Sequence, residues 1–355
     1  MTGTSTRDRA RGALLGLAVG DAAGFPALYH RTVRLGKRRG ALWRLSAGLD
    51  QQQVLRFVLP TSSALPEALH VGATDDGEFA ALTAIILLEC AGDYSTDALF
   101  AGWQRHVVEP ADGIWSGIAE RASITNARRG LRPPYTGNDN PAHFDDGAAA
   151  RAVAVGICFA GAPASAAVVA RNLAEITHAA DGVWAAEAMA ATISAAVAGS
   201  GLRDAIEAGH RLIPADSWLS RQVSHALELA GAAASAFDVA AELSDNVANS
   251  SYSFGTVAPE TLASAYALAL AADGDPQVAI PAAATIAKQA DSVPALVGAI
   301  TGALAGAEQL PAAWASRVEV LRGICVPALE GVRLSDLADK LLDGGTATRD
   351  ESQAS

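Results

Sequence analysis

The chain has 355 residues, of which 50% are hydrophobic and 18% charged, and its formal net charge is −12. This composition excludes a disordered chain, and the acidic balance argues against a nucleic-acid binder, which needs a basic face. Three widely separated cysteines, Cys90, Cys158 and Cys325, form neither a disulfide framework nor a paired metal motif. We therefore expect the protein in a reducing cytoplasm.

Apolar residues recur at helical spacing along most of the chain, and turn signals separate the periodic segments. The predicted helices are Asp8–Val19, Glu78–Ala91, Thr96–Val108, Ile118–Arg128, Gly147–Phe159, Ala164–Thr177, Gly182–Ala198, Leu202–Ile213, Trp218–Ala230, Val239–Val247, Pro259–Ala271, Gln277–Ala287, Val293–Glu308 and Pro311–Arg317. The first is expected to end at Gly20. Only 41–45 and 54–58 are strand candidates. One all-α domain over 1–343 with a flexible tail, 344–355, is the resulting prediction.

Two segments invite other interpretations. Residues 152–170 are the most membrane-like stretch, but Gly156, Gly161 and Pro163 interrupt it, which favours two short helices and no membrane span. Residues 31–44 contain six basic residues and no acid. This basic segment is either a solvated loop or a clamp for substrate phosphates or an acidic partner.

Two helix entrances carry clustered oxygen groups. Thr74, Asp75 and Asp76 precede one apolar helix, where they either cap free amides or form a hard oxygen cluster suited to Mg²⁺ or Mn²⁺. Asp291 and Ser292 precede another apolar helix. If the two entrances converge, Thr74, Asp75, Asp76 and Asp291 would supply four ligands to one cation.

Four blocks resemble the ADP-ribosylglycohydrolase family. Residues 12–24 are close to its opening, G-x-L-x-G-x-x-x-G-D-A-x-G, and 74–76 match its T-D-D-T block. Residues 146–151 are similar to G-N-G-x-x-M-R, and 291–306 resemble the end of G-x-D-T-D-T with its glycine-spaced helix. A weaker match, Thr177-His178, falls on a T-H pair. The resemblance spans about residues 8 to 310.

The resemblance implies a single-domain orthogonal helical bundle with a divalent metal in a cleft, cleaving an N- or O-glycosidic bond of a ribose. The metal ligands it implies are Thr74, Asp75, Asp76, Asp291 and Ser292. We expect Asp75, Asp76 and Asp146 to act in catalysis, and Gly20, Asp21, Asp145, Gly147 and His178 to contact the substrate. We expect one well-occupied Mg²⁺ (or Mn²⁺), a small ribosyl or ADP-ribosyl substrate, and a monomer without nucleic-acid or membrane partners.

Departures from the family pattern make the chain a divergent member. Gln289 stands where the family has an Asp ligand, and Leu28 where it often has a Glu that serves in catalysis or metal bridging. Gly77 replaces the second Thr of T-D-D-T. Either another acid (Asp21, Asp145 or Asp146) replaces the missing carboxylate, or the protein is a degenerate member that binds a ligand or has a structural role.

The remaining candidates keep two interpretations each. Asp145 and Asp146 either act in catalysis or cap the helix that begins at Gly147. The polar loop 135–146 is a connection or a substrate wall, and His178 is a ligand-binding or a satisfied core histidine. Tyr252 and Phe254 stack on a base or pack their loop onto the core, whereas Trp184 is expected in the core.

Overall fold

The computed structural model describes residues 4–29, 72–248, 254–286, 288, 290 and 292–353, with the backbone alone for 25–29 and 346–353. Both strand candidates, the basic segment, Tyr252, Gln289 and Asp291 lie outside the described residues. The side chain of Leu28 does as well.

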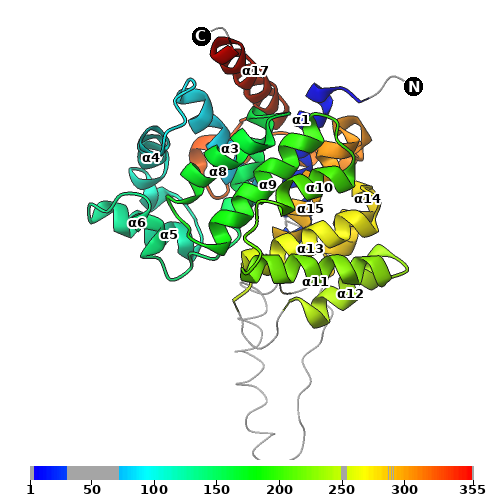
Figure 1. The fold of residues 1–355 in the computed structure, drawn as a ribbon. Helices are drawn as coiled ribbons and strands as arrows, with labels where there is room; N and C mark the ends of the chain where they lie inside the picture. Colours follow the sequence, from blue (N-terminus) through cyan, green and yellow to red (C-terminus); the bar gives the residue numbers. More distant parts are fainter. Residues whose placement is uncertain are drawn as a thin grey trace, which may run out of the picture.

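The described residues form helices, with only two isolated β-bridges, so the all-α prediction is confirmed (Figure 1). The α-helices are α1 Thr6–Tyr29, α3 Asp75–Glu89, α4 Thr96–Trp103, α5 Ile118–Arg128, α6 Tyr135–Asn138, α7 Gly147–Cys158, α8 Pro163–Ala174, α9 Asp181–Val197, α10 Leu202–His210, α11 Trp218–Ala232, α12 Ala236–Asn246, α13 Ala258–Ala271, α14 Pro276–Ala283, α15 Ser292–Ala305, α16 Ala312–Val318 and α17 Leu334–Gln353. A π-helical turn, Gln104–Val108, extends α4.

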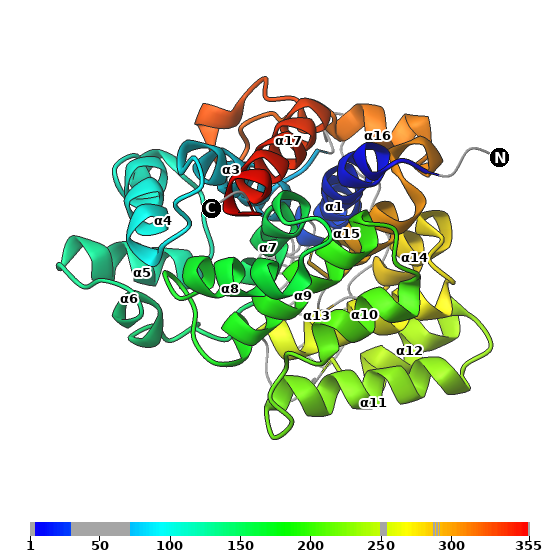
Figure 2. The ribbon, with the colours of Figure 1, turned by 45° about the horizontal axis from the view of Figure 1, so that its top comes forward.

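Helices α1 and α15 cross in direct backbone contact through facing glycines (Figure 2). A Cβ built on Gly16 would lie 2.0 Å from the carbonyl oxygen of Gly298, and one on Gly20 would lie 1.9 Å from that of Pro294. The predicted end of the first helix at Gly20 is therefore wrong. Gly20 lies inside α1, and the helix continues to Tyr29. The residue is a glycine because α15 leaves no room for a side chain there.

The centre of the molecule is built from α7 and α9, which pack on each other and are buried along almost their whole lengths. The membrane-like stretch divides into α7 and α8, which are separated by Gly161 at φ +82°. No helix within the described ranges is long and apolar enough to cross a membrane. Figure 1 places α4, α5 and α6 at one side of this centre and α11 with α12 at another.

Helix α17, Leu334–Gln353, includes the start of the predicted tail, whose flexibility stays a prediction. It passes through Gly344 and Gly345 and remains helical to Gln353. A Cβ on Gly345 would lie 1.7 Å from the carbonyl oxygen of Cys158, so this glycine permits a close approach to α7. The glycine pair therefore serves helix packing and does not end the helix.

Candidate functional site

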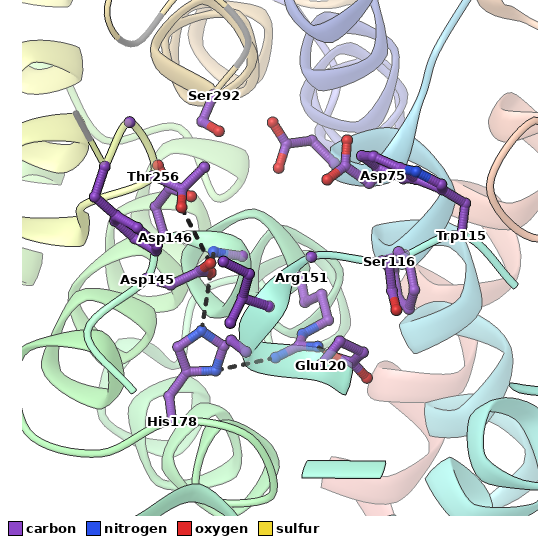
Figure 3. A pocket seen from close by; sticks show the side chains of 18 residues that line it. Asp75, Trp115, Ser116, Glu120, Asp145, Asp146, Arg151, His178, Thr256 and Ser292 are labelled. Atoms are coloured by element: carbon purple, nitrogen blue, oxygen red, sulfur yellow. Dashed lines mark hydrogen bonds and ion pairs between the residues drawn. The ribbon is translucent and has the colours of Figure 1, made fainter. Parts of the chain in front are cut away.

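A cavity of about 240 Å³ opens where the N-terminal ends of α3, α7 and α15 meet the loops before α5 and α13. We call it the acidic pocket. The residues that line it are Asp75, Asp76, Phe79, Trp115, Ser116, Gly117, Ile118, Ala119, Glu120, Asp145, Asp146, Gly147, Arg151, His178, Phe254, Gly255, Thr256 and Ser292. Figure 3 shows Asp75 on one side of the pocket and Asp145 with Asp146 on the other.

Seven of the predicted site residues line this pocket: Asp75, Asp76, Asp145, Asp146, Gly147, His178 and Ser292. The two acidic helix entrances, more than 200 residues apart in sequence, thus converge, because Ser292 begins α15 and Asp75 begins α3. Thr74, Gly20 and Asp21 are not in the lining, and Asp291 lies outside the described residues.

The start of α3 is held by Asp21 of α1. The buried Asp21 carboxylate accepts hydrogen bonds from the backbone N–H of Thr74 at 2.6 Å and of Gly77 at 2.9 Å, and another from the Thr74 hydroxyl. These bonds satisfy amides that α3 itself leaves unpaired at its first turn. Asp75 and Asp76 are not needed as caps and face the cavity instead. Substrate contact by Asp21 or Gly20 stays a prediction.

Gly77 fits the same arrangement. A Cβ at this position would lie 2.8 Å from the Ala73 Cβ and 3.2 Å from Asp21 Oδ2. A larger side chain would therefore press on the carboxylate that caps α3, which accounts physically for the glycine where the family block has threonine.

At the start of α7, Asp145 performs the capping. Its Oδ1 accepts from the Gly147 amide at 2.9 Å and from His178 Nε2 at 3.2 Å, while Oδ2 accepts from the Thr256 hydroxyl at 3.2 Å. Asp146 makes no side-chain cap, and its Oδ2 accepts from the Thr261 hydroxyl of α13 at 2.5 Å. The capping interpretation therefore holds for Asp145 and fails for Asp146.

A buried hydrogen-bond chain supports Asp145 from behind. Arg151 Nη2 donates to the Thr177 hydroxyl at 2.5 Å, which lies 2.7 Å from His178 Nδ1 and can donate to it. His178 Nε2 then donates to Asp145 (Figure 3). Burial lowers the pKa of His178, so the ring is neutral at pH 7. Its hydrogen-bond partners place the proton on Nε2. His178 is thus both a satisfied core histidine and a residue of the pocket.

The other end of Arg151 is an ion pair. Its Nη1 lies 2.5 Å from Glu120 Oε2, and Trp103 Nε1 donates to Glu120 Oε1 at 2.5 Å. Both charged side chains are 7% exposed, so this pair is desolvated and fixed. The ion pair joins α5 to α7 in the lining of the pocket.

Sequence reasoning missed the wall formed by Trp115 and Ser116. Trp115 is 51% exposed, whereas Ser116 is 7% exposed and its hydroxyl has no partner within the described part of the chain. Glu120, Arg151 and Thr256 were missed as well. Arg151 lies inside a recognised block and was the only one with a sequence signal, since the loop residues follow no periodic pattern.

Behind α3, Glu78 fixes the loop that supports Trp115. This fully buried carboxylate accepts from the amides of Ile324, Cys325 and Val326 at 2.7 to 2.8 Å. The Trp115 amide in turn donates to the Cys325 carbonyl at 2.9 Å. Burial and nearby carboxylates raise the pKa of Cys325, so its thiol stays protonated and unreactive.

The donors that face the cavity are suited to a hard cation. Asp75, Asp76 and Ser292 all offer oxygen, the ligand that Mg²⁺ and Mn²⁺ prefer. In the described ranges no three His, Cys, Asp or Glu side chains are arranged to hold a metal. The predicted four-ligand set needs Asp291, so it stays a prediction.

Phe254, one of the residues with two interpretations, lines the pocket and also packs edge-on against Phe144 with ring centroids 5.5 Å apart. Packing is therefore shown, and stacking on a base stays a prediction. Trp184 is partly buried against the core, in agreement with its expected place.

Comparison with known proteins agrees with the motifs. The model of the ADP-ribosylglycohydrolase family matches residues 2–351. A solved structure described as an ADP-ribosylglycohydrolase-related protein complex is 22% identical, with a TM-score of 0.60 over 96% of this chain and 99% of that one. At this identity the likeness shows the fold. No curated protein matches the sequence.

Proposed function

Because the chain belongs to the ADP-ribosylglycohydrolase family, we propose that the acidic pocket hydrolyses a ribosyl glycosidic bond. The observation that carries this proposal is the gathering of Asp75, Asp76, Asp146 and Ser292 around one cavity. They come from three helix entrances that have no proximity in sequence. Carboxylates at a cleft are the groups that glycoside hydrolysis requires.

In the proposed reaction, water attacks the anomeric carbon while the glycosidic bond breaks and its electron pair leaves with the aglycone. Asp146 takes the proton of the attacking water, because it faces the cavity and makes no side-chain cap to α7. Asp75 and Asp76 stabilise the positive charge that develops on the sugar. Thr261 orients Asp146 through its hydroxyl.

We further propose a dependence on Mg²⁺ or Mn²⁺ at one well-occupied site. Asp75, Asp76 and Ser292, together with Thr74 and Asp291, would hold the cation. When bound, it supplies polarisation of the ribose and orientation of the water. All three cysteines are free, which supports the cytoplasmic location proposed from their spacing.

The test is hydrolysis of a panel of nucleosides and ADP-ribosyl compounds by the full chain, with either cation or with a chelator. We expect turnover only with a cation, and Asp146→Asn should reduce kcat at least about a hundredfold, the usual loss for a general base. Asp204→Asn, at an exposed position of α10, is the matched control and should keep full activity. An active Asp146→Asn enzyme would assign the base elsewhere.

A degenerate, ligand-binding protein is the second candidate, favoured by Leu28 and Gln289 at positions where the family has carboxylates. It predicts that ribosyl compounds bind, by calorimetry, without product release under any cation condition. Turnover of any member of the panel would eliminate it.

A further inference from the structure

We infer that Trp115 and Ser116 form a nucleoside-binding wall of the acidic pocket. The indole of Trp115 stacks on a heteroaromatic base of the ligand, and the Ser116 hydroxyl makes a hydrogen bond to a polar atom of the same nucleoside unit. This assignment rests on the proposed function, which places a ribosyl compound in the pocket, and it adds the group that this compound carries.

Trp115 is a half-exposed aromatic side chain in the lining of the pocket. It is not among the side chains that pack against the hydrophobic core, and within the described residues its indole makes no hydrogen bond or ring contact. Figure 3 shows Trp115 on the Asp75 side of the pocket, away from Asp145 and Asp146. Aromatic side chains usually bury their faces, so a ring left open beside a cavity indicates a contact with a ligand.

Main-chain hydrogen bonds fix the loop that carries this ring. The Trp115 amide donates to the Cys325 carbonyl at 2.9 Å. The Arg121 guanidinium donates to the carbonyls of Ile114 and Ser116, each at 3.2 Å. None of these bonds uses the indole, so the loop is held in place while the aromatic face stays available. A ring positioned in advance loses little conformational freedom when a ligand binds.

Ser116 supplies an independent sign of a missing ligand. Its side chain lines the pocket and is 7% exposed, and its hydroxyl has no hydrogen-bond partner within the described part of the chain. Leaving a buried hydroxyl without a partner is costly, and such a group indicates a ligand or a water that completes it. Because Trp115 and Ser116 are adjacent and line one cavity, a single ligand can reach both.

The size of the pocket places a base at this wall. The cavity of about 240 Å³ is smaller than the roughly 300 to 1,000 Å³ of most ligand pockets, so a ribose that fills it leaves an attached base at the rim. Trp115 and Ile118 are the large apolar side chains of the lining that are exposed. Of these two, Trp115 offers a flat π face, the surface on which any nucleobase can stack.

The test measures the calorimetric Kd of the full chain, with Mg²⁺, for adenosine, ADP-ribose and ribose 5-phosphate, of which only the last lacks a base. Trp115→Leu should weaken binding of adenosine and ADP-ribose at least about fivefold, the lower end for the loss of one base–aromatic stack. It should leave ribose 5-phosphate unchanged. Trp115→Phe keeps a flat ring and should restore most of the affinity. Phe237→Leu removes a ring that is 52% exposed on α12 and, as the matched control, should change no Kd.

Ser116→Ala separates a ligand contact from a structural role. The hydroxyl makes no bond within the described residues that its removal would break, so the melting temperature should not fall. The Kd for adenosine should rise about two- to tenfold, the range for a neutral hydrogen bond. An unchanged Kd with a lower melting temperature would remove Ser116 from the wall.

A spectroscopic arm reports the stack directly. Adenosine should quench the tryptophan fluorescence of the wild type and not that of Trp115→Phe, because stacking brings the base onto the indole. This comparison stands even where Trp115→Leu fails to fold, which its melting temperature would reveal. The same ligands show which base is bound. A loss confined to ADP-ribose assigns the base that is remote from the reacting ribose, and a loss confined to adenosine assigns the base on that ribose.

The outcomes separate this inference from the proposed reaction. Unchanged Kd values of Trp115→Leu for both adenosine and ADP-ribose would overturn the wall and leave the glycohydrolase intact. An equal loss for ribose 5-phosphate would also overturn it, since the change would then disturb the whole pocket. Base-dependent losses without turnover of any compound in the panel would support the wall and sink the reaction. Failure of the wild type to bind any of the three ligands would overturn both.

Discussion

Replacing Asp21 tests the claim that α1 holds the entrance of α3 in place. Asp21→Ala removes a carboxylate that is 1% exposed and accepts three hydrogen bonds, two of them from backbone amides of the first turn of α3. A hydrogen bond to a charged group contributes about 1.5 to 3 kcal/mol, and a buried donor left without a partner is costly. The three bonds share one side chain and are not additive.

We therefore expect Asp21→Ala to lower the free energy of unfolding by about 3 to 5 kcal/mol, the range for removing one partner of a buried charged contact. Asp21→Asn can keep its oxygen as the acceptor for both amides, which bond Oδ2, and turn its NH2 toward the Thr74 hydroxyl, but it loses the negative charge. The expected loss is about 2 kcal/mol, closer to the removal of one charged hydrogen bond. Metal affinity should fall in both variants because Asp75 and Asp76 lose their fixed position.

The assay is urea unfolding followed by circular dichroism and tryptophan fluorescence. Midpoints and slopes are both compared, because a chain of 355 residues need not unfold in two states. Hydrogen exchange at Thr74 and Gly77 reports the cap directly. Asp112→Ala, at a 98% exposed side chain, is the control and should change little. A loss below about 1 kcal/mol for Asp21→Ala, with unchanged exchange at both amides, would refute the capping role.

Three other perturbations probe the packing and charge of the site. Gly16→Ala should destabilise by more than about 3 kcal/mol in urea unfolding because its Cβ would lie 2.0 Å from the Gly298 carbonyl oxygen, whereas Gly231→Ala, with no atom within 4 Å, should be neutral or stabilising. Glu78→Gln should lower the free energy of unfolding by about 2 kcal/mol, because the loop that supports Trp115 loses its charged acceptor. The wavelength of tryptophan emission should change as well, because the surroundings of Trp115 change. Burial lowers the pKa of His178 from 6.5, so below about pH 6.5 the unfolded chain binds a proton that the folded one refuses. Stability should therefore fall as pH drops through that range, and His178→Asn should flatten the slope measured by thermal unfolding.

The helices followed from periodicity, but several ends did not. Helix α5 has the predicted bounds, Ile118–Arg128, because its periodic apolar residues are flanked by turn residues. The end predicted at Gly20 used a local rule, that glycine often stops a helix. The competing reason for that glycine lies in α15, more than 270 residues away, and no local pattern contains it. The same limit applies to Gly345 against α7.

The site was predictable where function requires a motif at a helix entrance. Asp75, Asp146 and Ser292 were predicted at helix entrances and His178 from a T-H pair between helices, and the structure brings all four to one cavity. Trp115 and Ser116 were not found, because an exposed aromatic and a lone hydroxyl in a loop look like ordinary surface residues until the surrounding wall is known. The metal set remains a prediction, since Asp291 lies outside the described residues.

At each acidic helix entrance, the residue that caps the helix and the residues that face the pocket are different ones. At α3 the amides are satisfied by Asp21, and at α7 by Asp145, so neither helix requires its cavity-facing acid as a cap. Asp75, Asp76 and Asp146 line the pocket, and Asp146 also accepts a hydrogen bond from the Thr261 hydroxyl. Carboxylates buried beside a cavity repel one another, which costs stability unless a cation or a developing positive charge compensates. The cation proposed above, and the positive charge proposed for the sugar in the transition state, would each be stabilised by acids in this lining.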